Sequence, residues 1–126
     1  MKFVITGGAG FIGSHIAKHL VDKNHNVTIV DNLSRGRLEN LSKIKEQIEF
    51  KKIDILDFNS LKQVISDSDG VFHQAALTSV PESFTQKEKY HNVNVKGTEN
   101  IFKLAKEFGK KVVYASSSSI YGNTTT

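Results

Sequence analysis

The sequence contains no cysteine and no tryptophan, and it has only one proline and one methionine. The absence of cysteine excludes a disulfide framework and any metal site with thiolate ligands. The sequence also lacks an uninterrupted apolar run of the roughly 18 residues that a membrane-spanning helix needs. The N-terminus enters an apolar segment of strand length at once, without the pattern of a signal peptide. These absences predict a cytoplasmic protein with no membrane partner.

Composition and charge are ordinary for a globular domain. The chain has 126 residues, of which 38% are hydrophobic and 24% are charged, so one domain with a real core is expected. The net charge is +4, and the lysines and arginines are spread along the chain. No nucleic-acid partner is therefore predicted, although a positive field favours the approach of an anionic nucleotide. His15 and His19 stand four residues apart without an evident third ligand, so no metal site is expected.

Apolar runs of strand length alternate with segments of helical periodicity. This alternation predicts an α/β fold with a doubly wound parallel sheet, in which right-handed crossovers place the first strand at the centre. Lys51 and Lys52 interrupt the third predicted strand, which favours an edge position for it. The expected strands are residues 3–5, 27–30, 49–53, 70–73 and 111–115. The expected helices are residues 11–23, 38–48, a helix with Leu61, Val64 and Ile65 after an N-cap at Asp57, and 86–108.

Glycines follow the first predicted strand directly and lead into a helix. Gly8, Gly10 and Gly13 have the spacing of a dinucleotide-binding loop, and Gly7 gives a wider version of the same pattern. A strand that runs through glycines into a helix aims backbone N–H groups and the positive end of the helix dipole at one point, which suits a phosphate or pyrophosphate. A strand–helix turn without a ligand is the alternative. The expected buried face of this helix consists of Phe11, Ile12, Ile16, Ala17 and Leu20.

An acidic residue follows the second predicted strand. Asp31 stands 18 residues after Gly13, close to the distance at which a carboxylate accepts hydrogen bonds from the adenosine ribose. The alternative is a loop acid that opens the next segment. A carboxylate here repels a 2′-phosphate, so NAD is favoured over NADP, while Arg35 and Arg37 keep NADP open.

Two further strand ends carry candidate binding residues. Asp54 follows the third strand, where it could accept a hydrogen bond from an adenine amino group while Ile55 packs on the ring; a plain loop acid is the alternative. Ala75 and Ala76 follow the fourth strand, where small side chains let backbone approach a cofactor or simply pack. Because ligands bind beyond the carboxyl ends of the strands in such sheets, these positions are expected to share one edge.

The sequence resembles the extended short-chain dehydrogenase/reductase superfamily, and within it the NAD-dependent nucleotide-sugar epimerases and dehydratases, nearest to UDP-glucose and UDP-N-acetylglucosamine 4-epimerases. The resemblance covers the whole chain and implies a Rossmann fold. It rests on seven segments in the family's order: Thr6-Gly7-Gly8-Ala9-Gly10-Phe11-Ile12-Gly13, Asp31-Asn32-Leu33-Ser34-x-Gly36, Asp54-Ile55, His73-Gln74-Ala75-Ala76-Leu77, Ser79-Val80-Pro81, Asn94-Val95-x-Gly97-Thr98 and Ala115–Gly122.

The resemblance also implies roles for single residues. Ser117 matches the family's catalytic Ser/Thr position, although as a residue of the sequence alone it could be a strand-end serine bonded to backbone. Asn94 could equally be a structural amide. The implied NAD contacts are Gly7, Gly10, Phe11, Ile12, Gly13, Asp31, Asn32, Ser34, Arg35, Gly36, Asp54, Ile55, Gln74, Ala75, Ala76, Leu77 and Asn94. The implied substrate contacts are Thr78, Ser79, Val80, Ser117 and Ser118.

One feature of the family is missing. The superfamily uses a Tyr-x-x-x-Lys pair on one helix face, in which the lysine lowers the pKa of the tyrosine that acts as base. Here the residues four positions after Tyr90, Tyr114 and Tyr121 are asparagine, serine and threonine. We therefore expect residues 1–126 to be the N-terminal part of an NAD-binding domain, from a longer enzyme or a truncated gene product, with the Tyr-x-x-x-Lys helix and the substrate domain absent. The unpaired edge of the fifth strand is expected to self-associate or pair with another chain.

The resemblance implies an epimerase that inverts C4 of a UDP-sugar by transient hydride transfer to tightly bound NAD, as a homodimer when full-length. The chain alone is expected to be inactive. A 4,6-dehydratase or another extended short-chain oxidoreductase is the first alternative, but Ser118 and Ser119 stand where dehydratases carry an acidic pair. A non-catalytic module that binds NAD or ADP is the second alternative.

Overall fold

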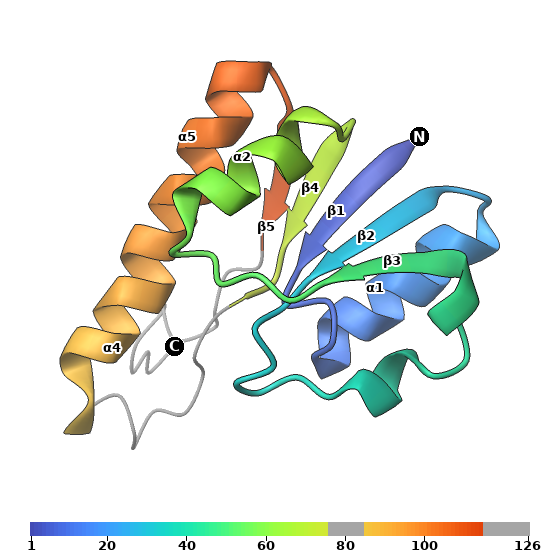
Figure 1. Ribbon diagram of the computed structural model, residues 1–126, viewed down its shortest axis with the longest axis horizontal. Helices are drawn as coiled ribbons and strands as arrows, with labels where there is room; N and C mark the ends of the chain where they lie inside the picture. The colour runs from blue at the N-terminus through green and yellow to red at the C-terminus, as the bar shows by residue number, and fades with distance from the viewer. Residues whose placement is uncertain (76–84, 115–126) are drawn as a thin grey trace, which may run out of the picture.

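Five parallel strands form one sheet in the computed structural model, which describes residues 1–75 and 85–114. The strands are β1 (Lys2–Thr6), β2 (Asn26–Val30), β3 (Ile48–Lys51), β4 (Gly70–His73) and β5 (Lys111–Tyr114), in the order β3-β2-β1-β4-β5 (Figure 1). Every neighbouring pair is parallel. The predicted doubly wound sheet is confirmed, with β1 at its centre and β3 at an edge.

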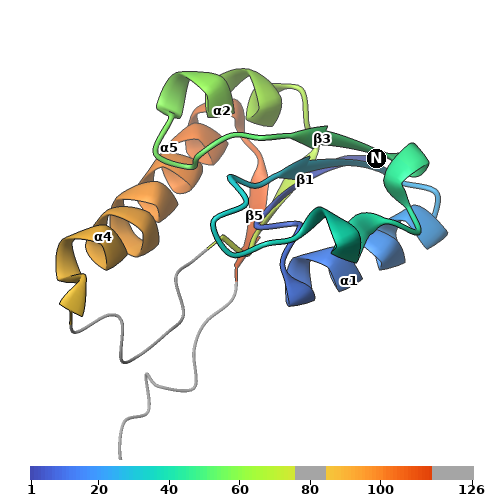
Figure 2. The same ribbon diagram turned by 60° about the horizontal axis from the view of Figure 1, so that its bottom comes forward.

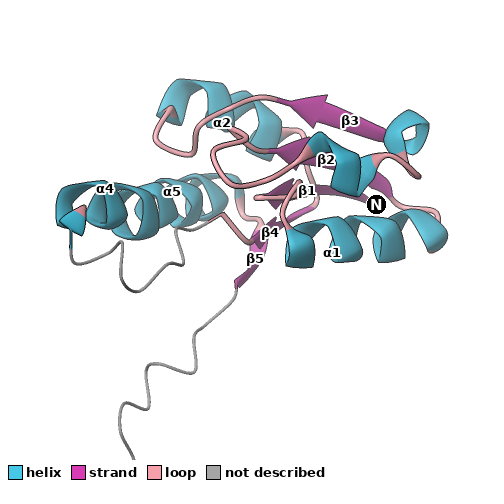
Figure 3. Ribbon diagram, turned by 90° about the horizontal axis from the view of Figure 1, so that it is seen from below, coloured by secondary structure: helices cyan, strands magenta, loops and turns pink. Residues whose placement is uncertain are grey.

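Helices cover both faces of the sheet. Helix α1 (Phe11–Asp22) lies on one face, while α2 (Phe58–Ser66) and α5 (Thr98–Phe108) lie side by side on the other (Figures 2 and 3). Successive residues of a strand point to opposite faces, so Val4 packs toward α2 and α5 whereas Ile5 packs toward α1. Two apolar layers result, one on each side of the sheet.

Helix α1 buries a different face from the predicted one. Ala17 and Leu20 are buried as expected, but Phe11 is 77% exposed and Ile12 is 59% exposed. Gly13 and Ser14 are buried instead, and Gly13 packs against the loop residues Gly7 and Gly8. The missing side chain of Gly13 lets the helix approach this loop closely, and a pattern of large apolar side chains does not reveal such a position. The prediction was therefore wrong for Phe11 and Ile12.

The segment between β2 and β3 forms two 3₁₀ turns, Leu38–Leu41 and Lys45–Gln47, rather than one amphipathic helix. Leu41 and Ile44 are buried. Leu38 is 53% exposed, so the expected apolar stripe is only partly used.

The predicted helix 86–108 is continuous but not uniform. It begins as α4 (Lys87–His91), widens into a π-helix over Asn92–Gly97 and continues as α5. Gly109 ends it in the left-handed region with φ of 66°, as the sequence predicted. Asp57 caps α2 as predicted, because its carboxylate accepts hydrogen bonds from the hydroxyl and backbone N–H of Ser60, and these bonds lower the pKa of Asp57.

Strand β5 forms the second edge of the described sheet. Val113 and Tyr114 on it are 55% and 57% exposed. The expectation that this edge pairs with another chain stays a prediction. Within residues 1–75 and 85–114, no helix is both long and apolar enough to cross a membrane.

Candidate functional site

Two positions between the end of β1 and the first turn of α1 have room for glycine only. Gly7 has a φ of 67°, and a Cβ on it would lie 2.7 Å from the backbone nitrogen of Ala75. Gly13, in the first turn of α1, backs onto the carbonyl of Gly7, and a Cβ there would lie 2.8 Å from the Cα of Gly8. The loop is held by hydrogen bonds from Gly7 N to Val30 O (2.8 Å) and from Gly10 N to Gly7 O (3.1 Å).

The N-terminus of α1 opens toward the carboxyl ends of the strands. Its N-cap residue, Gly10, has no side chain that could cap the helix, and no acidic residue stands in its first turn. The positive end of the helix dipole is therefore neither capped nor neutralised by this helix's own side chains. Such an end favours an anion.

Asp31 lies directly beside this loop. Its side chain is only 8% exposed. One carboxylate oxygen accepts a hydrogen bond from Ala9 N at 3.0 Å, and the other accepts one from Leu33 N at 2.8 Å. Each oxygen keeps acceptor capacity for a ligand hydroxyl, because a carboxylate has about four lone-pair sites.

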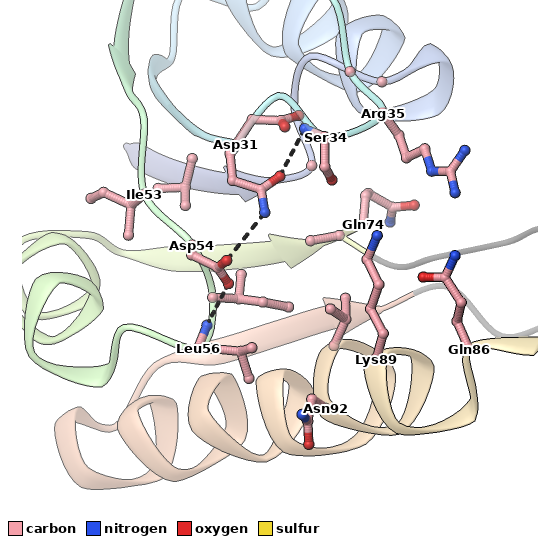
Figure 4. A pocket seen from close by; sticks show the side chains of 18 of the residues that line it. Asp31, Ser34, Arg35, Ile53, Asp54, Leu56, Gln74, Gln86, Lys89 and Asn92 are labelled. Atoms are coloured by element: carbon pink, nitrogen blue, oxygen red, sulfur yellow. Dashed lines mark hydrogen bonds between the residues drawn. The ribbon is translucent and has the colours of Figure 1, made fainter. Parts of the chain in front are cut away.

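A short chain of hydrogen bonds joins the ends of β2 and β3 (Figure 4). Asn32 accepts from Ser34 N at 3.0 Å and donates to Asp54 Oδ2 at 3.2 Å. Asp54 Oδ1 accepts from Leu56 N at 2.9 Å. The Asp54 carboxylate is thus fixed at the wall of the cavity with acceptor capacity left on its oxygens.

Ile55, which follows Asp54, is held by a hydrogen bond from α5. The Asn100 amide donates to Ile55 O at 2.9 Å. Ile55 also packs on Gly97, where a Cβ would lie 2.7 Å from Ile55 Cγ1. One tie from the long helix to the loop after β3 therefore runs through Asn100.

These parts surround one cavity of about 690 Å³ at the carboxyl ends of the strands. Many of the sequence-predicted cofactor residues line it: Gly7, Gly10, Asp31, Asn32, Ser34, Arg35, Gly36, Asp54, Ile55, Gln74 and Ala75. The structure does not place Phe11, Ile12, Gly13 or Asn94 in its lining. Ala76, Leu77, Thr78, Ser79, Val80, Ser117 and Ser118 lie outside the described residues.

One wall of the cavity was not predicted from the sequence. It comes from α4 and the residues on either side of it: Thr85, Gln86, Lys87, Glu88, Lys89, Asn92 and Val93. Figure 4 shows Lys89 and Gln86 extending toward Gln74. Most of these side chains are exposed and polar, so hydrophobic periodicity does not mark them. The paired Lys87 and Lys89 were the available signal of a basic wall.

The sequence profile of the NAD dependent epimerase/dehydratase family matches residues 3–126. The chain belongs to this family. Among curated relatives, it is 42% identical over 124 residues to UDP-N-acetyl-alpha-D-glucosaminuronate decarboxylase of Bacillus cytotoxicus, covering 98% of this chain and 39% of the relative. It is 34% identical over 129 residues to UDP-glucose 4-epimerase of Bacillus subtilis, covering 97% and 38%.

Solved structures of similar proteins share the fold closely. UDP-glucose 4-epimerase from Stenotrophomonas maltophila, with bound NAD and formylated UDP-arabinopyranose, superposes with a TM-score of 0.93 at 32% identity, over 100% of this chain and 40% of that chain. UDP-N-acetylglucosamine 4-epimerase from Methanobrevibacter ruminantium, in complex with UDP-N-acetylmuramic acid, gives 0.91 at 41% identity, over 98% and 40%. The present chain thus spans about two-fifths of the length of these proteins.

Proposed function

We propose that this chain is the NAD-binding part of an enzyme that modifies a UDP-sugar, of the UDP-hexose 4-epimerase type. The observation that supports this most is the cavity of about 690 Å³ that gathers the glycine loop, Asp31 and Asp54 at the carboxyl ends of neighbouring strands. Membership of the NAD dependent epimerase/dehydratase family agrees with it. So does the bound NAD of the structurally similar epimerase from Stenotrophomonas maltophila.

The described residues fit a dinucleotide. The close approach of Gly7 to Ala75 leaves bare backbone beside the α1 N-terminus, which suits a pyrophosphate. In this proposal Asp31 binds the adenosine ribose, while Asn32, Asp54 and Ile55 bind the adenine. Gln74 and Ala75, at the end of β4, lie on the nicotinamide side. When bound, NAD would accept a hydride from a sugar carbon and return it.

We assign NAD rather than NADP on electrostatic grounds. In the proposed binding mode the buried Asp31 carboxylate lies beside the hydroxyls of the adenosine ribose. A 2′-phosphate on that ribose would meet a like charge. Arg35 also lines the cavity, so the choice is tested directly with both dinucleotides.

The 126 residues alone are proposed to bind without turnover, because no tyrosine in them is followed four residues later by lysine. In the complete enzyme the substrate is proposed to be a UDP-sugar and the assembly a homodimer. Decarboxylation of a UDP-linked uronic acid is a second candidate activity, since the relative at 42% identity carries that name.

Calorimetry on the 126-residue chain tests the proposal. We expect heat of binding with NAD and with ADP, and weaker binding of NADP. Asp31→Ala should weaken NAD binding by about 10- to 100-fold, because it removes charge-assisted hydrogen bonds of about 1.5–3 kcal/mol. Asp22→Ala removes the same charge from the exposed end of α1 and should leave the affinity unchanged.

Ser117→Ala should hardly change NAD affinity, since Ser117 is assigned to the sugar. Absence of binding heat with NAD and ADP at millimolar concentration contradicts the proposal. Turnover of UDP-galactose by the purified chain contradicts its inactivity, and equal losses in Asp31→Ala and Asp22→Ala contradict the site.

A further inference from the structure

Three polar side chains meet beneath the cavity at a junction of three elements. Thr6 ends β1, His73 ends β4 and Thr98 begins α5. The Thr6 hydroxyl lies 2.6 Å from His73 Nδ1, and His73 Nε2 lies 2.8 Å from the Thr98 hydroxyl. Thr6 is fully buried and His73 is 6% exposed, so water does not replace these partners readily.

The Thr6 hydroxyl also receives two backbone N–H groups. Gln74 N lies 3.1 Å and Ala75 N lies 3.2 Å from Thr6 Oγ1. Gln74 N has a second acceptor in Thr6 O at 3.0 Å, so Ala75 N is the group that depends most on the hydroxyl. A hydroxyl has two acceptor lone pairs and one proton. With both lone pairs engaged, its proton goes to His73.

The protonation of His73 follows from this count. Nδ1 must accept from Thr6 and therefore carries no proton. Nε2 then carries the proton of the neutral ring and donates it to Thr98. Burial lowers the pKa of His73 to about 4, which agrees with a neutral imidazole at pH 7.

We propose that His73 is a positioning residue of the cofactor cavity: its Nε2–H tautomer orients the Thr6 hydroxyl so that this oxygen holds the backbone of Ala75 in place. Ala75 lines the cavity, and its nitrogen lies against Gly7 of the glycine loop. A shift of Ala75 would therefore change the cavity wall and the loop together. The identity of the bound molecule rests on the proposed function, whereas the tautomer and the contact do not.

Nuclear magnetic resonance of the 126-residue chain tests the tautomer without any ligand. The two ring nitrogens of His73 have different ¹⁵N shifts when protonated and unprotonated. We expect Nδ1 to be unprotonated and Nε2 to be protonated at pH 7. A protonated Nδ1 overturns the proposal.

Two substitutions at His73 separate positioning from packing. His73→Asn keeps an acceptor oxygen at the place of Nδ1 but is smaller, whereas His73→Leu fills space and accepts nothing. We expect exchange of the Ala75 amide to be about five- to tenfold faster in His73→Leu, the size of one lost hydrogen bond, and close to wild type in His73→Asn. The reverse order would show a packing role and overturn the proposal.

Variants of Thr6 and a matched control complete the test. Thr6→Val removes the hydroxyl at nearly constant volume and should speed Ala75 exchange as His73→Leu does, while Thr6→Ser should not; this pair decides the matter if His73→Leu does not fold. His19→Leu, on the exposed side of α1, is the control.

NAD affinity should fall about tenfold in His73→Leu and recover mostly in His73→Asn. A wild-type chain that binds no NAD contradicts the proposed function, and the tautomer and exchange results still decide the positioning claim.

Discussion

The Asp31 carboxylate accepts a hydrogen bond from Ala9 N at 3.0 Å, so a side chain at the end of β2 closes the loop between β1 and α1. The same carboxylate lines the cavity. Asp31 therefore supports the fold of the glycine loop in addition to its proposed contact with the ribose. Its substitution should change stability as well as binding.

We expect Asp31→Ala to lower the free energy of unfolding by about 2 kcal/mol, because Ala9 N and Leu33 N lose their acceptor. Asp31→Asn keeps one acceptor oxygen and should cost about half as much. Urea denaturation of both variants gives these values. An Asp31→Ala chain as stable as wild type would show that the loop holds itself together.

Gly13→Ala should destabilise the chain by about 1–3 kcal/mol, the usual cost of overpacking. The added Cβ would meet backbone atoms of Gly7 and Gly8, which cannot rotate away. Gly10→Ala is the comparison, since its Cβ would lie 3.3 Å from Gly7 O and needs only a small adjustment. Equal thermal midpoints for the two variants would contradict the close approach of α1 to the loop.

Stability should fall as the solution is acidified from pH 6.5 to about 4, the interval between the ordinary pKa of His73 and its lowered value. In this window the unfolded chain binds a proton that the folded chain does not, so the unfolding free energy rises with pH. The full interval is worth on the order of 3 kcal/mol. Urea denaturation at several pH values measures it, and His73→Asn should remove this part of the slope. An unchanged slope in His73→Asn would assign the dependence to other groups.

Tyr90→Phe should leave the chain as stable as wild type or stabilise it by about 1 kcal/mol. Tyr90 is 8% exposed, and within the described part of the chain its buried hydroxyl has no hydrogen-bond partner. Removing such a group recovers its desolvation cost. Calorimetric melting tests this, with Tyr114→Phe on the exposed edge strand as the control. A loss above about 1 kcal/mol in Tyr90→Phe would show that the hydroxyl has a partner in solution.

The order of the elements could be predicted because strand-length and helical periodicities alternate cleanly and the crossover rule then fixes the centre. The π-helix over Asn92–Gly97 could not, since six residues carry too little apolar pattern to reveal a wider turn. The exposure of Phe11 could not be predicted, because the first turn of α1 buries glycine and serine rather than large side chains.

Some residues of the candidate site could be predicted from the sequence and others could not. Asp31 and Asp54 stand directly after strands, where position along the chain predicts position in space. Lys89 and Asn92 line the cavity from positions that precede the motif Asn94-Val95-x-Gly97-Thr98, so no motif marked them. The contact between Thr6 and His73 spans 67 residues, and only the register of β1 against β4 brings the two together.

Because the cavity lies at the carboxyl ends of the strands, the chain should tolerate changes in length very unevenly. One residue added inside β1 would advance Gly7 by about 3.3 Å and detach it from Ala75. The turns at the opposite end, around residues 24–25 and 109–110, are remote from that junction. Affinity tags or grafted peptides belong in those turns, where added length leaves the geometry of the cavity intact.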